Sequence, residues 1–264
     1  MLFRSLAAAG FTAEDPQELK DISVLLFGGA GTAKTSVSAT ASKVPEMSPV
    51  LYLDFERGTL PLRDWGDLDN LTIVHLDSWA ETNKFIYQVV RPAMQTGSFP
   101  YRTVVLDTVD ALQELIVNES KAANPGNNYV PWTDAYDNVV TLVDAFRRVD
   151  GVNLIVITHV DRMTNSVTGE TQVGPAFKGN QSGKHMPSKF DFVAYMQAGQ
   201  DNGRPIMRAS FFLPGAITKR RTRSFPDHLI NPTMAQIWSL AHNTESAKDR
   251  KSTRLNSSHS TESR

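Results

Sequence analysis

Five runs of apolar, often β-branched residues alternate along the chain with segments of helical length. The runs, which are predicted to form strands, span residues 22–27, 50–55, 71–76, 103–106 and 153–158. Helices are predicted over residues 34–43, 80–94, 109–121 and 133–148. Nearly continuous apolar strands that alternate with helices indicate a parallel sheet covered on both faces. Because ligands bind beyond the carboxyl ends of such strands, we expect functional residues directly after each run.

The pattern becomes irregular after the fifth run. Residues 162–189 are rich in glycine and predict a long flexible loop. Residues 190–196 and 205–213 predict two antiparallel edge strands, and Asn231-Pro232-Thr233 predicts the cap of a last short helix ending near Leu240. We therefore expect an N-terminal arm at residues 1–20, one domain at 21–245 and a disordered tail at 246–264. The tail resembles the translation of a common sequencing adapter, which predicts an assembly artefact in environmental sequence.

Composition narrows the class of protein. The 264 residues are 41% hydrophobic and 21% charged, which is typical of a soluble globular protein. The absence of cysteine excludes disulfides and thiolate metal sites. A formal charge of -1 argues against a globally basic nucleic-acid binder, so any contact with DNA must come from a local patch. No apolar run has membrane-spanning length and no signal-peptide core is present, so we expect a cytoplasmic protein without a membrane partner.

The glycine-rich segment after the first run is predicted to bind phosphate. Backbone N–H groups of such a turn, and the start of the helix that follows, can surround a triphosphate. Lys34 can reach the β and γ phosphates, and the Thr35 hydroxyl can ligate Mg²⁺. Ala33 stands where a glycine is expected, which is tolerable if its φ stays below zero. The predicted nucleotide contacts in this segment are Gly28, Gly29, Ala30, Gly31, Thr32, Ala33, Lys34, Thr35 and Ser36.

Two other interpretations of this segment stay open from the residues alone. Gly29-Ala30-Gly31 could begin a dinucleotide fingerprint, with Asp54 at a suitable distance for a ribose contact. Lys34 then occupies the closing small position, which fails the pattern, and an oxidoreductase of this kind would prefer NAD to ATP. The segment could also be an ordinary strand-to-helix turn. The motifs at the other strand ends favour phosphate binding.

Carboxylates follow the second and fourth runs. Glu56 lies furthest beyond the second run, where it could orient and deprotonate a water beside a γ-phosphate; a solvated acidic loop is the alternative. Asp107 ends the fourth run and is predicted to hold Mg²⁺ together with Thr35. Thr158 and His159 end the fifth run and could contact the γ-phosphate. No second histidine stands at ligand spacing, so we do not expect a histidine metal site.

Two irregular stretches and one basic cluster are candidates for contacts with other molecules. Lysines interleaved with an aromatic can neutralise phosphates and stack a base of single-stranded nucleic acid, although a solvated surface loop explains them equally well. Residues 122–132 could line the same channel. Lys219 and Arg221 could reach the nucleotide of a neighbouring subunit, although a solvated basic turn is the alternative. The residues predicted to bind DNA are Arg162, Phe177, Lys178, Lys184 and Lys189.

Taken in order, these motifs resemble those of short phage AAA-type ATPases with a RecA-like core, a group that includes single-strand-annealing recombinases. The resemblance implies an α/β P-loop NTPase fold with a mostly parallel central sheet, helices on both faces and antiparallel edge strands. It makes Glu56 the water-activating carboxylate, Thr158 and His159 the γ-phosphate sensor, and residues 122–132 and 162–189 the two DNA loops. Lys219 and Arg221 would act on the neighbouring subunit's nucleotide.

The function implied by the resemblance is that of a Mg²⁺-dependent ATPase that binds single-stranded DNA in phage recombination or replication. Such a protein is expected to form a ring or filament with its active site at the subunit interface, and a single-strand-binding protein is a further expected partner. Ala33 and the histidine at the sensor depart from the family pattern. The alternative function is a nucleotide-dependent switch or loader that acts on a protein partner without binding DNA.

Overall fold

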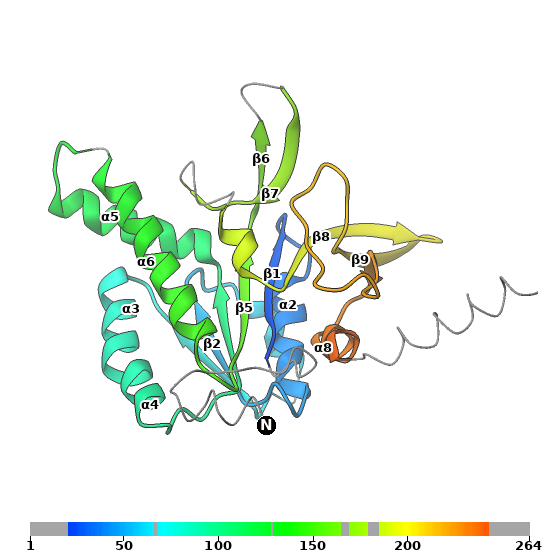
Figure 1. Cartoon of the computed structure of the whole chain (residues 1–264), viewed down its shortest axis with the longest axis horizontal. Helices are drawn as coiled ribbons and strands as arrows, with labels where there is room; N and C mark the ends of the chain where they lie inside the picture. The colour runs from blue at the N-terminus through cyan, green and yellow to red at the C-terminus, as the bar shows by residue number, and fades with distance from the viewer. Residues whose placement is uncertain (1–20, 66–67, 128, 165–168, 179–184, 243–264) are drawn as a thin grey trace, which may run out of the picture.

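The computed structural model of the chain describes residues 21–65, 68–127, 129–164, 169–178 and 185–242. The predicted N-terminal arm, the predicted tail and Lys184 lie outside the described residues. Eight strands form the central sheet, in the order β10-β9-β8-β1-β5-β4-β2-β3 (Figure 1). Their bounds are β1 Ser23–Gly28, β2 Val50–Asp54, β3 Leu71–His75, β4 Thr103–Asp107, β5 Asn153–Thr158, β8 Phe192–Asp201, β9 Arg204–Ser210 and β10 His228–Ile230.

The six strands from β8 to β3 run parallel. Their register brings the strand ends together, because Asp54 at the end of β2 lies opposite Asp107 at the end of β4. At the same edge Phe27 of β1 lies opposite Thr158 of β5. The predicted α/β class with a mostly parallel sheet is confirmed, and the candidate residues that follow these strands share one edge.

Helices cover both faces of the sheet. α5 (Val109–Ala123) and α6 (Val130–Arg147) pack on one face together with α3 (Trp79–Phe85), a π-helical turn (Ile86–Val90) and α4 (Arg91–Gln95). The other face carries α2 (Lys34–Ala39), the 3₁₀ turn Thr40–Lys43 and α8 (Met234–His242). Within the described part of the chain, no helix combines the length and the apolar character needed to cross a membrane.

The strands are apolar throughout because successive residues enter opposite cores. Leu25 and Phe27 of β1 belong to the core under α5 and α6, whereas Val24 and Leu26 belong to the core under α2 and α8. Since the side chains of a strand alternate between faces, both sets must be hydrophobic. Burial on both faces explains the continuous apolar run from which β1 was predicted.

Residues 190–196 and 205–213 contain two antiparallel strands, β8 and β9, as predicted, but neither strand lies at the edge of the sheet. β8 lies inside the sheet, parallel to β1 and antiparallel to β9, and β9 is itself covered by β10. The physical reason is visible in the sequence of β8, whose first half is buried on both faces as in a parallel strand. Because β8 runs parallel to β1, the chain must first return to the amino end of the sheet.

The segment predicted as one long loop contains regular structure. β6 (Val160–Thr164) and β7 (Thr171–Pro175) pair as an antiparallel hairpin that projects beyond the end of β5 (Figure 1). A 3₁₀ turn (Met186–Lys189) then leads into β8. Both hairpin strands are largely exposed and short, so they form a separate two-stranded sheet rather than joining the central one.

The predicted cap of the last helix is confirmed. The backbone N–H of Gln236 donates to Thr233 Oγ1 at 3.3 Å, and the backbone N–H of Thr233 donates to Gln236 Oε1 at 3.0 Å. These reciprocal bonds satisfy two N–H groups at the start of α8. The helix ends at His242, two residues beyond the expected position.

Candidate functional site

The glycine-rich turn after β1 surrounds the Lys34 ammonium with its own carbonyls. Lys34 Nζ donates to Gly28 O at 2.9 Å and to Gly29 O at 2.8 Å. Burial lowers the pKa of Lys34, while the negative charges of Asp107, Asp110 and Glu56 act in the opposite direction. The cation is therefore held within the turn, where it can exchange these carbonyl contacts for phosphate oxygens.

Gly28 is required by close packing between β1 and β8. A Cβ atom at this position would lie 2.4 Å from the Met196 carbonyl oxygen, which belongs to the backbone of β8. A side chain here would have to push the two strands apart. The first glycine of the turn is thus fixed by the sheet as well as by its possible contact with phosphate.

Ala33 occupies a left-handed backbone conformation. Its φ is 61° and its ψ is 22°, so the condition under which an alanine is easily tolerated here is not met. The reason is that the chain must reverse sharply from the turn into α2, and this needs the conformation that glycine adopts most easily. The left-handed region costs an alanine about 1 kcal/mol or more. The turn has the backbone conformation that glycine favours, and the alanine in this conformation lowers the free energy of unfolding.

Asp107 is a buried carboxyl that accepts two hydrogen bonds at one oxygen. Thr35 Oγ1 donates to Asp107 Oδ2 at 2.7 Å, and the Tyr52 hydroxyl donates to the same atom. Burial raises the pKa of Asp107 to about 6, although both hydrogen bonds counteract the rise. Burial and the neighbouring Asp107 raise the pKa of Tyr52 well above its usual value, so the phenol stays a neutral donor.

This arrangement fits a divalent cation. A carboxylate and a threonine hydroxyl are oxygen ligands of the kind that Mg²⁺ prefers. Thr35 and Asp107 already lie within hydrogen-bond distance of each other, and a cation there would offset the cost of the buried negative charge. Tyr52 was missed by the sequence analysis, because its contact with Asp107 depends on the pairing of β2 with β4.

Asp54 organises the loop that carries Glu56. Its carboxylate accepts the backbone N–H of Glu56 at 3.0 Å and that of Gly58 at 3.1 Å, and it also binds Thr59 and His75. Asp54 is only 1% exposed. It is therefore committed to its own loop, which does not fit the ribose contact of the dinucleotide alternative. Glu56 lies beyond it, and its Oε1 accepts a hydrogen bond from Thr108 Oγ1 at 2.6 Å.

His159 joins two carboxylates at the end of β5. Its Nδ1 lies 2.8 Å from Asp110 Oδ2 and 3.6 Å from Glu56 Oε1. The three side chains each bring a possible metal-ligand atom within 4.8 Å of the others. The sequence analysis considered only a second histidine as a partner and missed Asp110. The signal was its place in the first turn after the fourth strand, next to the strand that ends at His159.

Thr158 does not reach the surface of the site. Its side chain is fully buried, and its hydroxyl lies 3.4 Å from the His159 carbonyl oxygen. The contact of His159 and Thr158 with the γ-phosphate stays a prediction, and Thr158 is the more buried of the two residues.

Lys219 and Arg221 lie at the opposite end of the sheet from the glycine-rich turn. Lys219 Nζ donates to the carbonyls of Ser188 and Phe190, and its backbone pairs with Val193 near the start of β8. Arg221 binds Asp191 at 2.9 Å. Because Asp191 also binds Ser23 at the start of β1, both cations lie at the amino end of the strands. Neither can reach the turn after β1 within one chain.

The residues predicted to bind DNA are not gathered in one place. Arg162 is exposed on β6, and Lys178 forms an ion pair with Glu114 on α5. Lys189 lies at the amino end of the sheet, where its Nζ donates to both oxygens of Asp144 at 2.8 Å. The physical reason is that Lys189 directly precedes β8, and the parallel pairing of β8 with β1 places its start at the amino end of the sheet.

Phe177 is buried, so the prediction that it stacks on a base was wrong for this conformation. The side chain is 5% exposed and packs in the core under α5 and α6. The exposed aromatics of this end of the molecule lie instead at the junction of α5 and α6. Tyr129 is 79% exposed, and Lys121 Nζ lies 5.6 Å from the centre of the Trp132 ring.

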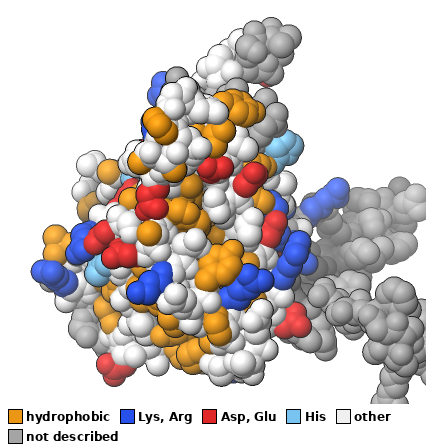
Figure 2. Space-filling model, turned by 90° about the vertical axis from the view of Figure 1, so that its left-hand side faces the viewer, with side chains coloured by type: hydrophobic (Ala, Val, Ile, Leu, Met, Phe, Trp, Pro, Cys, Tyr) orange, Lys and Arg blue, Asp and Glu red, His pale blue; other side chains and the backbone are white. Residues whose placement is uncertain are grey.

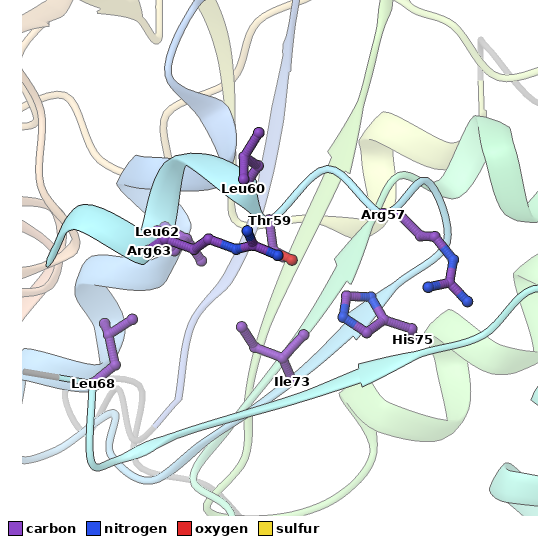
Figure 3. A pocket seen from close by; sticks show the side chains of 8 residues that line it. All are labelled: Arg57, Thr59, Leu60, Leu62, Arg63, Leu68, Ile73 and His75. Carbon is purple, nitrogen blue, oxygen red and sulfur yellow. The ribbon is translucent and has the colours of Figure 1, made fainter. Parts of the chain in front are cut away.

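Charges of both signs are interspersed on the side of the molecule that carries these helices (Figure 2). A separate open cavity of about 500 Å³ lies beside the loop that follows Glu56 (Figure 3). Its lining combines an apolar floor with basic side chains, namely Arg57, Thr59, Leu60, Leu62, Arg63, Leu68, Ile73 and His75. Arg57 is paired with Asp77 and His75 with Asp54, so two of the basic side chains that line the cavity already have acidic partners.

Comparison with known proteins gives a family and a set of similar folds. A search of curated proteins found no match. Three solved structures are similar to this chain at low identity. They are a KaiC-like protein from the hyperthermophilic archaeon Pyrococcus horikoshii OT3 (14% identity, 72% of this chain and 77% of that chain, TM-score 0.42), the flagellar accessory protein FlaH from Methanocaldococcus jannaschii (13%, 79% and 84%, 0.43) and the RadB recombinase (14%, 79% and 84%, 0.47).

The family model described as "AAA domain" matches residues 20–250, which includes all the described strands and helices. The mostly parallel sheet carries the glycine-rich turn after β1 and the acid at the end of β4, as the sequence predicted. By this match the chain belongs to the AAA domain family of nucleotide-binding ATPases.

Proposed function

We propose that this protein hydrolyses ATP with Mg²⁺ and couples hydrolysis to the binding of single-stranded DNA. The observation that carries the proposal is the meeting of Lys34, Thr35, Asp107 and Glu56 at one edge of the sheet. A phosphate-binding turn, a cation site and a water-activating carboxylate are the parts that phosphoryl transfer to water requires.

Each residue has a chemical role in this proposal. The Lys34 ammonium exchanges its contacts with Gly28 and Gly29 for phosphate oxygens. Thr35 and Asp107 would hold Mg²⁺, which supplies positive charge to the phosphates when bound. Glu56 orients a water molecule and accepts its proton, with Thr108 fixing one carboxylate oxygen.

Lys219 and Arg221 support an assembly of several subunits. Because they lie at the amino end of the strands, they can act on a nucleotide only if it is bound by another copy of the chain. We therefore propose a ring or filament in which these two cations stabilise the charge on a neighbouring γ-phosphate. Hydrolysis per subunit is then expected to rise with protein concentration.

The proposed DNA contacts follow from the hairpin of β6 and β7. This hairpin begins directly after His159, so a change at the γ-phosphate can alter its position. Arg162 is exposed on the hairpin, and Tyr129 is exposed at the junction of α5 and α6. Both segments project at the same end of the molecule (Figure 1). A role in phage recombination or replication, with a single-strand-binding protein as partner, is part of this proposal.

A second candidate function is a nucleotide-dependent switch that acts on a protein partner. The observations that favour it are the burial of Phe177 and the ion pair of Lys178 with Glu114, which remove two of the predicted DNA contacts. An exposed aromatic such as Tyr129 suits a protein interface as well as a base.

The experiment that tests both functions is steady-state ATP hydrolysis with and without single-stranded DNA, over a series of salt concentrations. For the DNA-dependent enzyme, DNA raises the rate, and its half-saturating concentration increases steeply with salt because phosphate contacts release counterions. Hydrolysis that ignores DNA at low salt would favour the protein-directed switch. A chain that neither binds nor hydrolyses ATP would overturn both.

A further inference from the structure

The His159 ring nitrogen Nδ1 lies between two carboxylates that can compete for its proton. Asp110 Oδ2 lies at 2.8 Å, which is hydrogen-bond distance, whereas Glu56 Oε1 lies at 3.6 Å, which is too long. Asp110 also accepts the backbone N–H of His159 at 3.1 Å through its other oxygen. The two bonds fix both the ring and the backbone of His159 to the first turn of α5.

A carboxylate can only accept, so the bond to Asp110 places a hydrogen on Nδ1. The second ring nitrogen, Nε2, makes no hydrogen bond to any residue in the described part of the chain. The ring is 37% exposed. His159 therefore keeps Nε2 available for a ligand while Nδ1 is held by Asp110.

Glu56 depends on this arrangement. Its Oε1 already accepts the Thr108 hydroxyl at 2.6 Å. If Asp110 is removed, the same oxygen is the next acceptor for the Nδ1–H group of His159. A small rotation of the His159 ring would close the gap of 3.6 Å. The carboxylate would then be tied to the imidazole, and a hydrogen-bonded carboxylate is a weaker base toward water.

We propose that Asp110 is a positioning residue that keeps Nδ1 of His159 away from Glu56, so that Glu56 accepts no further hydrogen bond beyond that of Thr108 and Nε2 faces the ligand. The inference rests on the proposed hydrolytic function. Asp110 does not touch the reacting atoms and acts only through His159. Its effect must therefore vanish when His159 is absent, which separates this role from a general contribution to the fold.

The test is a double-mutant cycle of ATP hydrolysis on the full chain. We expect Asp110→Ala to lower kcat about tenfold with little change in KM, as is typical for residues that orient a functional side chain. In a His159→Gln background the same change is expected to cost less than about twofold. An equal loss in both backgrounds would overturn the proposal. Asp137→Ala, which removes an exposed carboxylate from α6, is the matched control and leaves both backgrounds unchanged.

A second variant and a spectroscopic measurement test the proposal where Asp110→Ala does not fold or no ATP is hydrolysed. If Asp110→Ala fails to fold, Asp110→Asn keeps the volume but offers one accepting oxygen for two donors, and a smaller, about threefold loss of kcat is expected. Nitrogen-15 spectra of the His159 ring, assigned by comparison with His159→Gln and recorded above the pH at which imidazole charges, read the tautomer without any catalysis. A proton on Nδ1 supports the inference, and a proton on Nε2 overturns it, even if the protein hydrolyses no ATP.

Discussion

The carboxyl edge of the sheet and the segments predicted to bind DNA differ in the burial and the partners of their charged side chains. At the edge, Lys34 and Asp107 are buried and their partners belong to the turn and to neighbouring strands. In the other region, Lys178 is half-buried and paired with a carboxylate of the same chain. The first region is fixed by the fold, whereas the second must exchange an internal ion pair before it can hold phosphate. Only the second is suited to regulation.

Removal of the Glu56 carboxylate is the strongest test of the fixed region. Glu56→Gln keeps the shape of the side chain but cannot accept a proton, so we expect kcat for ATP hydrolysis to fall by about 10²- to 10⁴-fold. Nucleotide affinity, measured by titration calorimetry, should change little because Lys34 and the turn are intact. Glu46→Gln, at an exposed position before the start of β2, is the control. Undiminished hydrolysis by Glu56→Gln would assign the base elsewhere.

The Asp107 carboxyl is proposed to bind Mg²⁺, but its burial is expected to lower the free energy of unfolding. Its folded pKa of about 6 is above the value of about 3.9 in an unfolded chain, so above pH 6 the ionised carboxyl destabilises the native state. Without metal, we expect Asp107→Asn to increase the free energy of unfolding at pH 7.5 by about 2 kcal/mol. The gain should shrink as the pH falls from 6 to 4, where native Asp107 takes up a proton.

Urea unfolding across this pH range measures the effect, and the same variant should lose Mg²⁺-dependent hydrolysis. A variant that is less stable than the parent at pH 7.5 would show that the hydrogen bonds from Tyr52 and Thr35 outweigh the cost of burial.

The segments predicted to bind DNA can be tested by removing the carboxylates that pair with their lysines. Glu114→Gln releases Lys178 at the end of the molecule that carries the hairpin, so we expect affinity for single-stranded DNA to rise about threefold and to depend more steeply on salt. Asp144→Asn releases Lys189 at the amino end of the sheet and should have no such effect. Fluorescence anisotropy with a labelled oligonucleotide compares the two. Equal gains would mean that net charge, rather than position, controls binding.

The smallest effect is expected at the turn itself. Ala33→Gly removes the cost of a left-handed alanine, at φ 61°, but makes the unfolded chain more flexible. We expect a net gain of about 0.5 to 1 kcal/mol in the free energy of unfolding. Chemical denaturation with and without nucleotide provides the measurement. Ala30→Gly, in the same turn, is the comparison, because Ala30 is not among the residues with positive φ and should lose rather than gain stability.

The strands and the chemistry of the carboxyl edge could be predicted because both are local in sequence. Glu56 and Asp107 directly follow apolar runs, and parallel pairing alone brings such positions together. The path of the chain after β5 could not be predicted in this way. The burial of Phe177 and the location of Lys189 both follow from the return of the chain to begin β8, which no spacing between motifs reveals.

Side chains that act through a neighbour were also missed. Tyr52 reads as one more apolar strand residue and Asp110 as an ordinary acid in the first turn of a helix, which commonly stabilises the helix dipole. Their roles depend on which strands are adjacent in the sheet. Sequence reasoning proposed residues for contact with the ligand and missed the side chains that hold those residues in place.

The hairpin of β6 and β7 is joined by backbone hydrogen bonds to the segment that leads to Lys219. The N–H of Val173 donates to Gly215 O at 2.8 Å, and the N–H of Ile217 donates to Val173 O at 2.7 Å. Two residues later, Lys219 pairs with Val193. These bonds connect the hairpin to Lys219 through a continuous path of backbone contacts. If the proposed assembly forms, the same path gives a displaced hairpin a mechanical connection to a cation at the opposite end of the sheet.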